Sequence, residues 1–406
     1  MNVLGLIVEY NPFHNGHLYH LKESVKKTNA NVVIAVMSGN FLQRGEPSII
    51  SKWKRTEMAL LNGVDLVIEL PYVFATQKAE TFANGAVSIL EALHCDSLCF
   101  GSESGEINPF LQTTQFLLKR QLEYDELIKK HVQTGVSYPK ALTLAFQELA
   151  GDQEILDLSL PNNILGFHYV SAIYKQKSKI KPYTIKRSSA GYHDETITSP
   201  TIASATSIRK TLFSSDSEEV NISNYVPPET LERINKYKAE NTLLHNWENY
   251  FHYLKYSILT MRKEEIQSIY EVEEGLENRI LKFIIQSTSF HEFIEKLKSK
   301  RYTWTRLQRV CTHILTNTTK QQMKDITELS PYIRLLGMTE KGQKYLNSIK
   351  KDVPIPLISK VSSFQHPFLD IDIKASYTYN MVFQEPNRSL RLQDEYTSPP
   401  IRIVRK

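Results

Sequence analysis

Two histidines three residues apart, His14 and His17, are the residues whose type and spacing best suit them to chemistry. They flank Gly16 in the segment Asn11-Pro-Phe-His-Asn-Gly-His17, which follows the apolar run 3–8. A strand that turns into a helix directs free backbone N–H groups and the positive end of the helix dipole towards the turn. Imidazoles there could donate hydrogen bonds to a triphosphate and stabilise charge on departing pyrophosphate, and Gly16 would allow close approach of the phosphate.

A second phosphate-binding element is predicted in the stretch Ile202-Ala-Ser-Ala-Thr-Ser-Ile-Arg209. Either Ser204 or Thr206 can cap the helix that begins here, while backbone N–H groups and Arg209 meet the β and γ phosphates. The alternative is an ordinary capped surface helix. The histidine pattern at the end of the same sheet favours the phosphate interpretation.

Further candidate residues follow other predicted strands. The glycine-containing loop 37–45 is expected to line the site, and Gly101 would let a nucleoside lie against the backbone. Asn162 and Asn163 open a helix and either cap it or reach the nucleotide. Arg187 and the group Gly191-Tyr-His-Asp194 are expected to contact purine or phosphate. Lys52, Lys54 and Arg55 lie beside Trp53: either Lys52 or Arg55 reaches the acid substrate or phosphate, or the group is a solvated helix N-terminus.

A basic segment far downstream contains two aromatic side chains. Cations grip phosphates and aromatic rings stack on unpaired bases, so this segment predicts an RNA-contacting surface. The alternative is an amphipathic helix with a hydrated basic face. Its candidate RNA-binding residues are Lys296, Lys298, Lys300, Arg301, Tyr302, Trp304, Arg306 and Arg309.

The elements that would position these residues alternate between short apolar runs and amphipathic stretches over the first 200 residues. This alternation is typical of an α/β fold, a Rossmann-like parallel sheet covered by helices, with its ligand at the carboxyl ends of the strands. The expected strands are 3–8, 32–37, 66–70, 97–100 and 183–186. The expected helices are 17–27, 54–62, 79–93 and 163–175.

Three parts are expected along the chain. Residues 1–205 would form the nucleotide-binding domain, with a helical insertion at about 109–148 made of two helical patterns joined near Thr134-Gly135. Residues 206–349 read as a mostly helical domain for binding RNA. The C-terminal segment 350–406 contains Val353-Pro-Ile-Pro356 and Ile371-Asp372-Ile373, which we expect either to pair as short strands or to pack back on the sheet.

Composition restricts the class of protein further. Of the 406 residues, 41% are hydrophobic and 23% are charged, as in a folded globular protein. The first apolar run is too short for a signal peptide or a membrane span, and three cysteines favour a reducing compartment, so we expect a cytoplasmic protein without membrane contact, with Cys95 and Cys99 as buried thiols. Residues 1–200 hold 19 Lys and Arg against 20 Asp and Glu, so the net charge of +5 arises in the C-terminal half, where it suggests a polyanionic partner.

These residues together resemble the HIGH-motif nucleotidyltransferase superfamily, and more specifically the bacterial tRNA(Met) cytidine acetate ligase family. The resemblance is carried from residue 1 to at least Arg309. Its motifs are Val8-Glu-Tyr-Asn-Pro-Phe-His-Asn-Gly-His17, Met37-Ser-Gly-Asn-Phe-Leu-Gln-Arg-Gly-Glu-Pro47, Asp65-Leu-Val-Ile-Glu-Leu-Pro71, Phe100-Gly-Ser-Glu103, Pro161-Asn-Asn-Ile-Leu-Gly166 and Gly191-Tyr-His-Asp194.

The resemblance implies that acetate and ATP form acetyl-adenylate, whose acetyl group passes to the exocyclic amine of the wobble cytidine in elongator tRNA(Met). It implies His14, His17 and Arg209 as catalytic residues, and Mg²⁺ is expected with ATP on general grounds. No side-chain ligand for a metal is predicted. The implied ATP-binding residues are Ile7, Val8, Glu9, Tyr10, Asn11, Pro12, Phe13, His14, Asn15, Gly16, His17, Leu18, Tyr19, His20, Gly101, Asn162, Arg187 and Thr206.

Two other functions are compatible with parts of this pattern. A small-molecule nucleotidyltransferase, or an acid ligase similar to pantothenate synthetase, would share the histidine loop but have no use for a basic helical half. A non-catalytic RNA-binding protein could retain an inactive nucleotide fold. His14, His17 and Arg209 argue against the second of these.

Overall fold

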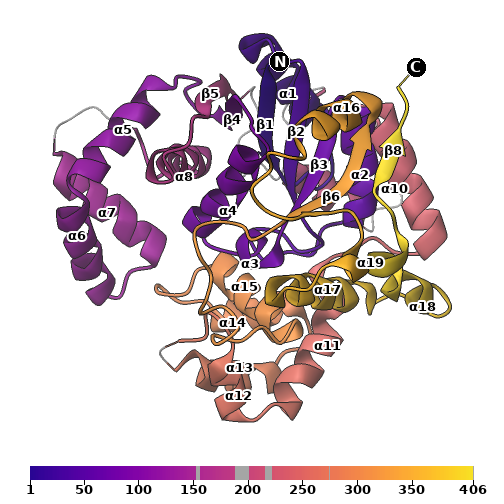
Figure 1. Cartoon of the computed structure of the whole chain (residues 1–406). Helices are drawn as coiled ribbons and strands as arrows, with labels where there is room; N and C mark the ends of the chain where they lie inside the picture. Colours follow the sequence, from indigo (N-terminus) through magenta and orange to yellow (C-terminus); the bar gives the residue numbers. More distant parts are fainter. Residues whose placement is uncertain (152–155, 188–200, 215–221, 274, 406) are drawn as a thin grey trace.

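The computed structural model describes residues 1–151, 156–187, 201–214, 222–273 and 275–405. Its centre is a sheet with strand order β5-β4-β1-β2-β3-β6-β7, in which β8 also pairs with β6. Strands β1 to β5 run parallel, as expected, while β6 is antiparallel to β3 (Figure 1). The strands are β1 (Val3–Val8), β2 (Val32–Ser38), β3 (Leu66–Leu70), β4 (Ser97–Ser102), β5 (Lys181–Lys186), β6 (Ile333–Thr339), β7 (Leu357–Ile358) and β8 (Ile401–Ile403).

Helices cover both faces of the sheet because alternate residues of the central strands face opposite layers. Leu4 and Leu6 pack with α1 and α2, whereas Val32 and Ile34 pack with α4 and α8 on the other face. The N-terminal helices are α1 (Asn15–Thr28), α2 (Lys52–Leu61), α3 (Tyr72–Ala75), α4 (Ala79–Ala92), α5 (Asn108–Lys119), α6 (Gln121–Gln133), α7 (Tyr138–Ala150), α8 (Pro161–Lys175) and α9 (Ala205–Phe213). All five strands and four helices expected in this region form, with small changes at their ends.

The insertion between β4 and β5 contains three helices, α5, α6 and α7, where two were expected. The expected joint near Thr134 is confirmed, since α6 ends at Gln133 and α7 begins at Tyr138. The additional break lies at Arg120, whose backbone is not helical. It separates α5, which packs on α8, from α6, which packs on α7.

The second half is mostly helical but also contributes to the sheet. Strand β6 lies inside the segment 206–349 that was expected to be helical, and its apolar side chains are buried between the two layers. The helices here are α10 (Pro228–Asn241), α11 (Trp247–Thr260), α12 (Lys263–Ser268), α13 (Leu276–Ile285), α14 (Phe290–Leu297), α15 (Trp304–Leu315) and α16 (Glu340–Ile349). The division of the chain into three parts therefore remains a prediction, with the sheet extending across its later boundaries.

The C-terminal segment packs back on the sheet domain, one of the two expected outcomes, and adds β7 and β8 to it. The run Ile371-Asp372-Ile373 is not a strand, however, but part of helix α17. Its alternation is misleading because Asp372 is buried as well, accepting hydrogen bonds from the Tyr72 backbone and the Tyr332 hydroxyl. The remaining elements are η1 (Val361–Ser363), α17 (Pro367–Asn380), α18 (Asn387–Leu392) and α19 (Asp394–Thr397).

Candidate nucleotide-binding site

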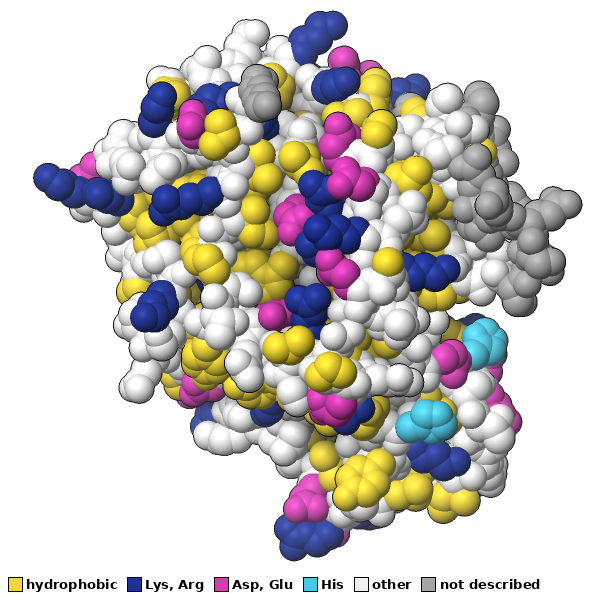
Figure 2. All heavy atoms as spheres, turned by 90° about the vertical axis from the view of Figure 1, so that its right-hand side faces the viewer, with side chains coloured by type: hydrophobic (Ala, Val, Ile, Leu, Met, Phe, Trp, Pro, Cys, Tyr) yellow, Lys and Arg dark blue, Asp and Glu magenta, His cyan; other side chains and the backbone are white. Residues whose placement is uncertain are grey.

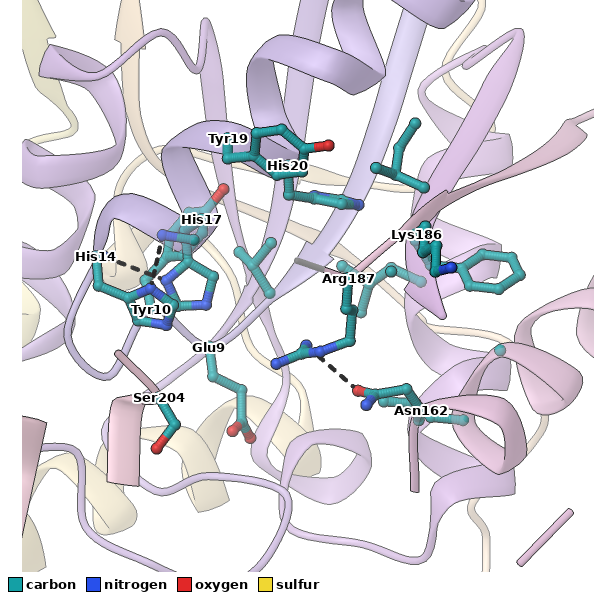
Figure 3. A pocket seen from close by; sticks show the side chains of 18 of the residues that line it. Glu9, Tyr10, His14, His17, Tyr19, His20, Asn162, Lys186, Arg187 and Ser204 are labelled. Atoms are coloured by element: carbon teal, nitrogen blue, oxygen red, sulfur yellow. Dashed lines mark hydrogen bonds between the residues drawn. The ribbon is translucent and has the colours of Figure 1, made fainter. Parts of the chain in front are cut away.

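A cavity of ≈ 230 Å³ opens at the carboxyl ends of β1, β4 and β5. The chain leaves β1 for β2 and β3 on one side, and later returns to β4 and β5 on the other, so β1 and β4 form the switch point at which open α/β sheets bind ligands. Figure 3 shows side chains from α1, β5, α8 and the segment just before α9 surrounding this space. Its lining residues are Ile7, Val8, Glu9, Tyr10, His14, Gly16, His17, Tyr19, His20, Gln43, Phe82, Phe100, Gly101, Asn162, Leu165, Gly166, Tyr169, Ile185, Lys186, Arg187, Ile202, Ala203 and Ser204.

The two motif histidines form the capping box of α1. His14 is the N-cap residue, and its Nδ1 accepts a hydrogen bond from the Gly16 backbone N–H at 3.0 Å. His17 Nδ1 accepts from the His14 backbone N–H at 3.3 Å, and the two rings lie with their centroids 3.8 Å apart. Because Nδ1 of each ring is an acceptor, the ring proton of each neutral imidazole is on Nε2. The motif therefore caps the helix and presents both rings at the cavity, and the ring N–H of His17 already has an acceptor in the Pro12 carbonyl, which a phosphate would replace or share.

Gly16 is required by its close contact with the His14 ring. A Cβ atom on Gly16 would lie 2.8 Å from His14 Cε1 and 3.0 Å from His14 Nδ1. Any side chain would therefore push the imidazole out of its capping position. In the sequence, this glycine was expected to allow close approach of a phosphate; the structure adds the fit of the histidine itself.

All three histidines at the cavity are held in the neutral form. Burial lowers the pKa of His14 to about 3 and that of His20 to about 4, and the Arg187 charge acts in the same direction on both. The pKa of His17 lies well below its ordinary value, chiefly through burial and then through the neighbouring His14. At neutral pH the rings are therefore uncharged hydrogen-bond donors, and a bound polyanion would raise their pKa values.

Arg187 supplies the fixed positive charge of the cavity. Its Nη1 donates to Asn162 Oδ1 at 3.4 Å, and Glu103 Oε1 in turn accepts from the Asn162 side-chain amide at 2.8 Å. The Arg187 side chain crosses Gly101, where a Cβ atom would approach Arg187 Cγ to 3.3 Å. The structure thus brings three of the predicted ATP-contacting residues, Gly101, Asn162 and Arg187, together on one side of the cavity.

The predicted second phosphate element lies at the rim of the cavity. Ser204 is the N-cap of α9, accepting from the Ser207 backbone N–H at 3.0 Å, and it lines the cavity, whereas Thr206 is exposed. Of the two proposed capping residues, Ser204 therefore has that role and Thr206 does not. Arg209 donates to the Asn11 carbonyl at 2.9 Å and pairs with Glu46 at 3.1 Å, so it braces the histidine loop without lining the cavity.

Some residues of the implied ATP-binding run support the turn and do not line the cavity. Phe13 is fully buried in the core, and Asn11 Oδ1 accepts from the Ile49 backbone at 2.7 Å. The Asn15 amide holds the carbonyls of Thr201 and Asn224. The residues of the implied set outside the cavity lining are Asn11, Pro12, Phe13, Asn15, Leu18 and Thr206.

The cavity also contains residues that sequence reasoning did not single out. Ile185 and Lys186 directly precede Arg187, and Leu165 and Gly166 lie one helical turn after Asn162. Their positions relative to these predicted site residues could therefore have indicated that they line the cavity. Phe82 and Tyr169 come from the interiors of α4 and α8, where an aromatic residue is indistinguishable in sequence from ordinary core. The group Gly191–Asp194 lies outside the described residues.

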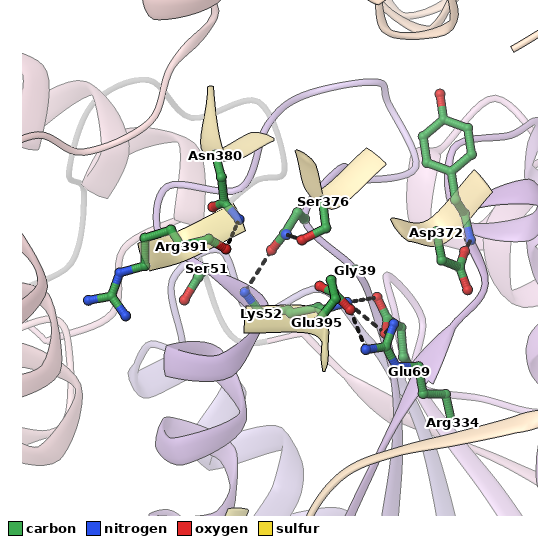
Figure 4. Close-up of polar contacts among 12 residues, drawn as sticks. Gly39, Ser51, Lys52, Glu69, Arg334, Asp372, Ser376, Asn380, Arg391 and Glu395 are labelled. Atoms are coloured by element: carbon green, nitrogen blue, oxygen red, sulfur yellow. Dashed lines mark hydrogen bonds and ion pairs between the residues drawn. The ribbon is translucent and has the colours of Figure 1, made fainter. Parts of the chain in front are cut away.

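Neither Lys52 nor Arg55 reaches the cavity, so the predicted substrate contact is wrong for both. Lys52 is buried between Glu69 and Glu395, at 2.7 Å and 2.9 Å, in an ion cluster that also contains Arg334 (Figure 4). Arg55 donates to the carbonyls of Glu9 and Ser38 and to that of Gly39. It therefore holds the ends of β1 and β2 together beneath the site, which the sequence could not distinguish from a ligand contact.

The basic segment of α14 and α15 is less available than its sequence predicts. Tyr302 is buried and its hydroxyl donates to the Glu273 carbonyl, so its ring does not fit the expected stacking role, whereas the Trp304 ring is half-buried against the core and its role remains a prediction. Arg309 is buried and paired with Glu271 at 3.0 Å. Lys298 and Lys300 remain exposed.

Charge on the surface is mixed. On the face drawn in Figure 2, Lys and Arg side chains are interspersed with Asp and Glu, and a column of alternating sign runs near its centre. Acidic partners neutralise much of the basic segment as well: Glu292 lies one turn before Lys296, and Glu273, distant in sequence, pairs with Arg306.

The described residues contain neither a candidate membrane span nor a candidate metal cluster. No helix in that part of the chain is long and apolar enough to cross a membrane. No set of three or more His, Cys, Asp or Glu side chains there is arranged to hold a metal ion. Cys95 and Cys99 are buried thiols, as predicted.

The fold and the site together define a nucleotide-binding transferase: a parallel α/β sheet with an H-x-G-H capping box at its switch point. Comparison with known proteins agrees, since the model of the HIGH nucleotidyl transferase family matches residues 1–394. The tRNA(Met) cytidine acetate ligase of Halalkalibacterium halodurans is 52% identical, covering 100% of this chain and 98% of the relative. That of Bacillus subtilis is 50% identical over 99% of this chain and 97% of its own length.

Two solved structures share the whole architecture. The apo crystal structure of Thermotoga maritima TmcAL superimposes with a TM-score of 0.91 at 33% identity, and that of the same protein bound with alpha-thio ATP with a TM-score of 0.89; each covers 100% of both chains. The chain belongs to the tRNA(Met) cytidine acetate ligase family of HIGH nucleotidyl transferases. The resemblance seen in the sequence is confirmed.

Proposed function

We propose that this protein is an ATP-dependent ligase that joins acetate to a cytidine of tRNA(Met), releasing AMP and pyrophosphate. The observation that carries the proposal is the pair of neutral imidazoles, His14 and His17, that offer Nε2–H donors at the N-terminus of α1. The names of the relatives identify the acid and the RNA, and the thio-ATP complex of the Thermotoga protein supports ATP as the nucleotide.

In the first step, an acetate oxygen attacks the α-phosphorus of ATP and pyrophosphate leaves. This reaction needs the two reactants held in line and the developing charge on the leaving group stabilised. We assign the second task to His14 and His17, assisted by the N-terminus of α1. Arg187 is assigned to the nucleotide, and Arg209, which anchors the Asn11 carbonyl, to the outer phosphates.

In the second step, the exocyclic N4 of the wobble cytidine attacks the carbonyl carbon of acetyl-adenylate and AMP leaves. AMP is a far better leaving group than the oxygen of acetate, so adenylation makes the acyl transfer possible. The amine of cytidine is a poor nucleophile, so orientation and exclusion of water must supply much of the rate. The base must also leave its stack to reach a cavity enclosed by side chains.

Mg²⁺ is proposed to enter with ATP. Glu9 is the one carboxylate among the described residues that line the cavity, so the phosphates would provide most of the oxygens around the ion. Omission of Mg²⁺ should abolish adenylation. We also propose a cytoplasmic location, because tRNA and ATP are available there.

The surface for the tRNA is proposed to include the exposed cations of the α14–α15 segment. Lys298 and Lys300 project into solvent, and Arg301 and Arg306 are half-exposed, so they can meet phosphates of the anticodon arm. Contacts of this kind release counterions, so the affinity for tRNA should fall steeply with salt. Charge-reversal at Lys298 and Lys300 should flatten that dependence.

The function is tested by incubating the protein with ATP, labelled acetate and bulk tRNA, and then analysing the tRNA nucleosides by mass spectrometry. We expect the label in N4-acetylcytidine, only when ATP is present and only in tRNA(Met). Label recovered in a small molecule but not in tRNA would support a small-molecule ligase instead. Absence of any acetate-dependent turnover of ATP would favour an RNA-binding protein without catalysis.

A further inference from the structure

Glu9 is the first residue after β1, and its side chain extends to the cavity. Gln43 N donates a hydrogen bond to Glu9 Oε1 at 2.8 Å, which fixes the carboxylate, and Arg55 Nη1 holds the Glu9 carbonyl at 2.7 Å. Figure 3 shows the carboxylate beyond the end of β1, in the region between Ser204 and Arg187. Among the described residues that line the cavity it is the only acidic side chain.

A carboxylate in this place opposes the binding of the substrates. ATP and acetate are both anions, and a fixed negative charge beside them raises the free energy of their complex with the protein. A lining of neutral donors and cations would bind them better. A negative charge in this place does help one step of the reaction, which is the removal of a proton from the attacking nitrogen.

The other side chains of the cavity are unsuited to accept a proton. His14 and His17 use the lone pair of Nδ1 for backbone N–H groups and carry the ring proton on Nε2. The phenol of Tyr10 is kept protonated because burial raises its pKa, and Lys186 and Arg187 are cations. His20 has a pKa lowered to about 4 by burial, which makes it a weak base.

We propose that Glu9 is the catalytic base of acetyl transfer, taking the proton from cytidine N4 as this nitrogen attacks the acetyl-adenylate. The N4–carbon bond forms, the bond between the carbonyl carbon and the phosphate oxygen breaks, and AMP departs with that electron pair. One N4 proton moves to a Glu9 carboxylate oxygen and later passes to solvent. The inference rests on the proposed function and adds a residue to its second step.

The surroundings of Glu9 suit this role. Burial raises its pKa, and the Glu46 carboxylate acts in the same direction, while the Gln43 backbone bond and the charges of Arg44 and Arg209 oppose them. Arg55 also faces it from α2, and His14, His17, Lys186 and Arg187 line the same cavity. A carboxylate with a raised pKa is a stronger base than a solvated one.

The test separates the two half-reactions in the full-length protein. Adenylation is measured as acetate-dependent exchange of labelled pyrophosphate into ATP. Transfer is measured as single-turnover formation of N4-acetylcytidine in tRNA(Met). For Glu9→Gln, which keeps the shape of the side chain and an oxygen for the Gln43 N–H, exchange should stay within about threefold of the unaltered protein while transfer falls by on the order of 100-fold. Glu9→Asp should recover part of the transfer rate.

Glu57→Gln provides a matched control, because this half-buried carboxylate lies on α2 away from the cavity and should leave both reactions unchanged. Transfer by the unaltered protein should rise with pH and level off above the pKa of Glu9, and Glu9→Gln should lose that dependence. An equal fall in exchange and transfer would overturn the proposal in favour of a role in binding ATP or Mg²⁺, and unchanged transfer would also overturn it. Failure of the unaltered protein to acetylate tRNA would instead overturn the proposed function.

Discussion

At the scale of single residues, hydrogen bonds decide which atoms of the histidine motif are available to a ligand. The spacing of His14 and His17 makes them the N-cap and N3 residues of α1, so each ring uses Nδ1 within the helix start and directs its proton through Nε2. The same capping arrangement recurs with asparagines in α11, where Asn246 and Asn249 replace the two histidines. Capping alone therefore does not require imidazole.

This comparison gives a sharp test of His17. His17→Asn should preserve the capping bond to the position-14 backbone, as Asn249 does in α11, but remove the Nε2–H donor. We expect acetate-dependent ATP–pyrophosphate exchange to fall by about 10²–10³-fold, as when a donor to a developing charge is removed, while the free energy of unfolding changes by less than about 1 kcal/mol. His17→Ala should lose both. Near-normal exchange in either variant would exclude the phosphate role.

Gly16→Ala tests the fit of the His14 ring. The new methyl group would lie 2.8 Å from His14 Cε1, so the imidazole must turn away from its cap. Exchange should fall more than tenfold although alanine itself favours a helix. Chemical denaturation distinguishes this local effect from unfolding. If a structure of the variant showed the His14 ring unmoved and exchange intact, the fit would not matter.

At the scale of elements, helix α15 supports the loop between β2 and α2. Gly45, with φ of +78°, packs so closely that a Cβ atom would lie 2.4 Å from the Arg309 backbone nitrogen, and Thr312 Oγ1 donates to the Gly45 carbonyl at 2.7 Å. The same loop supplies Gln43 to Glu9 and Glu46 to Arg209. The sequence pattern predicted only an RNA-contacting role for α15, and this second role depends on a contact between residues 267 positions apart.

Thr312→Val should therefore weaken both the fold and the reaction. Removing the hydroxyl leaves the buried Gly45 carbonyl without its donor, which costs about 1–3 kcal/mol of unfolding free energy. Exchange should fall severalfold because Arg209 loses a fixed neighbour. Thr312→Ser keeps the hydroxyl and should restore exchange, measured in parallel with urea denaturation. Equal activity of the valine and serine variants would show that the contact does not position the loop.

At the scale of the whole molecule, a buried ion cluster joins the sheet to the C-terminal segment. Lys52 of α2, Glu69 of β3, Arg334 of β6 and Glu395 of α19 form alternating pairs in the interior (Figure 4). The opposing charges raise the pKa of Arg334, and Arg334 with Lys52 lowers that of Glu395 despite burial, so the cluster favours the charged forms of Arg334 and Glu395. Such a cluster is tolerated only while complete.

Glu395→Gln should destabilise the protein strongly. It leaves two buried cations with one carboxylate, and we expect the unfolding free energy to fall by roughly 3–5 kcal/mol. Glu57→Gln, which breaks half-buried pairs with Lys54 and Arg233, should cost less than about 1 kcal/mol. Urea denaturation of both variants gives the comparison. Similar small losses in the two would mean that the cluster does not secure the C-terminal segment.

Buried neutral histidines should make the protein sensitive to acid. Burial lowers the pKa of His168 to about 4 and that of His313 to about 3, as for His20 and His14, whereas in the unfolded chain a histidine titrates near 6.5. Between those values the unfolded chain binds more protons, so stability is complete above pH 6.5 and declines as the pH falls. Urea midpoints at pH 7.5, 6 and 5 should decrease in that order; a constant midpoint would contradict these assignments.

The parts of the fold that could be predicted are those with local signals. Strand β1, the turn at His14 and α1 follow from an apolar run, a capping pattern and a helical period, and the parallel sheet followed from their repetition. Strand β6 could not be assigned, because its pairing with β3 depends on residues nearly 270 positions away. The predictions for Lys52 and Tyr302 were wrong for the same reason. The role of a charged or aromatic side chain depends on whether it is buried, and burial is set by contacts with distant residues.

The account depends most directly on where the triphosphate binds, and a crystal structure with a non-hydrolysable ATP analogue and Mg²⁺ would measure this. We predict phosphate oxygens within about 3 Å of Nε2 of both His14 and His17, with the nucleoside against Gly101 and Arg187. An analogue bound elsewhere, with the cavity between β1 and β4 empty, would contradict it.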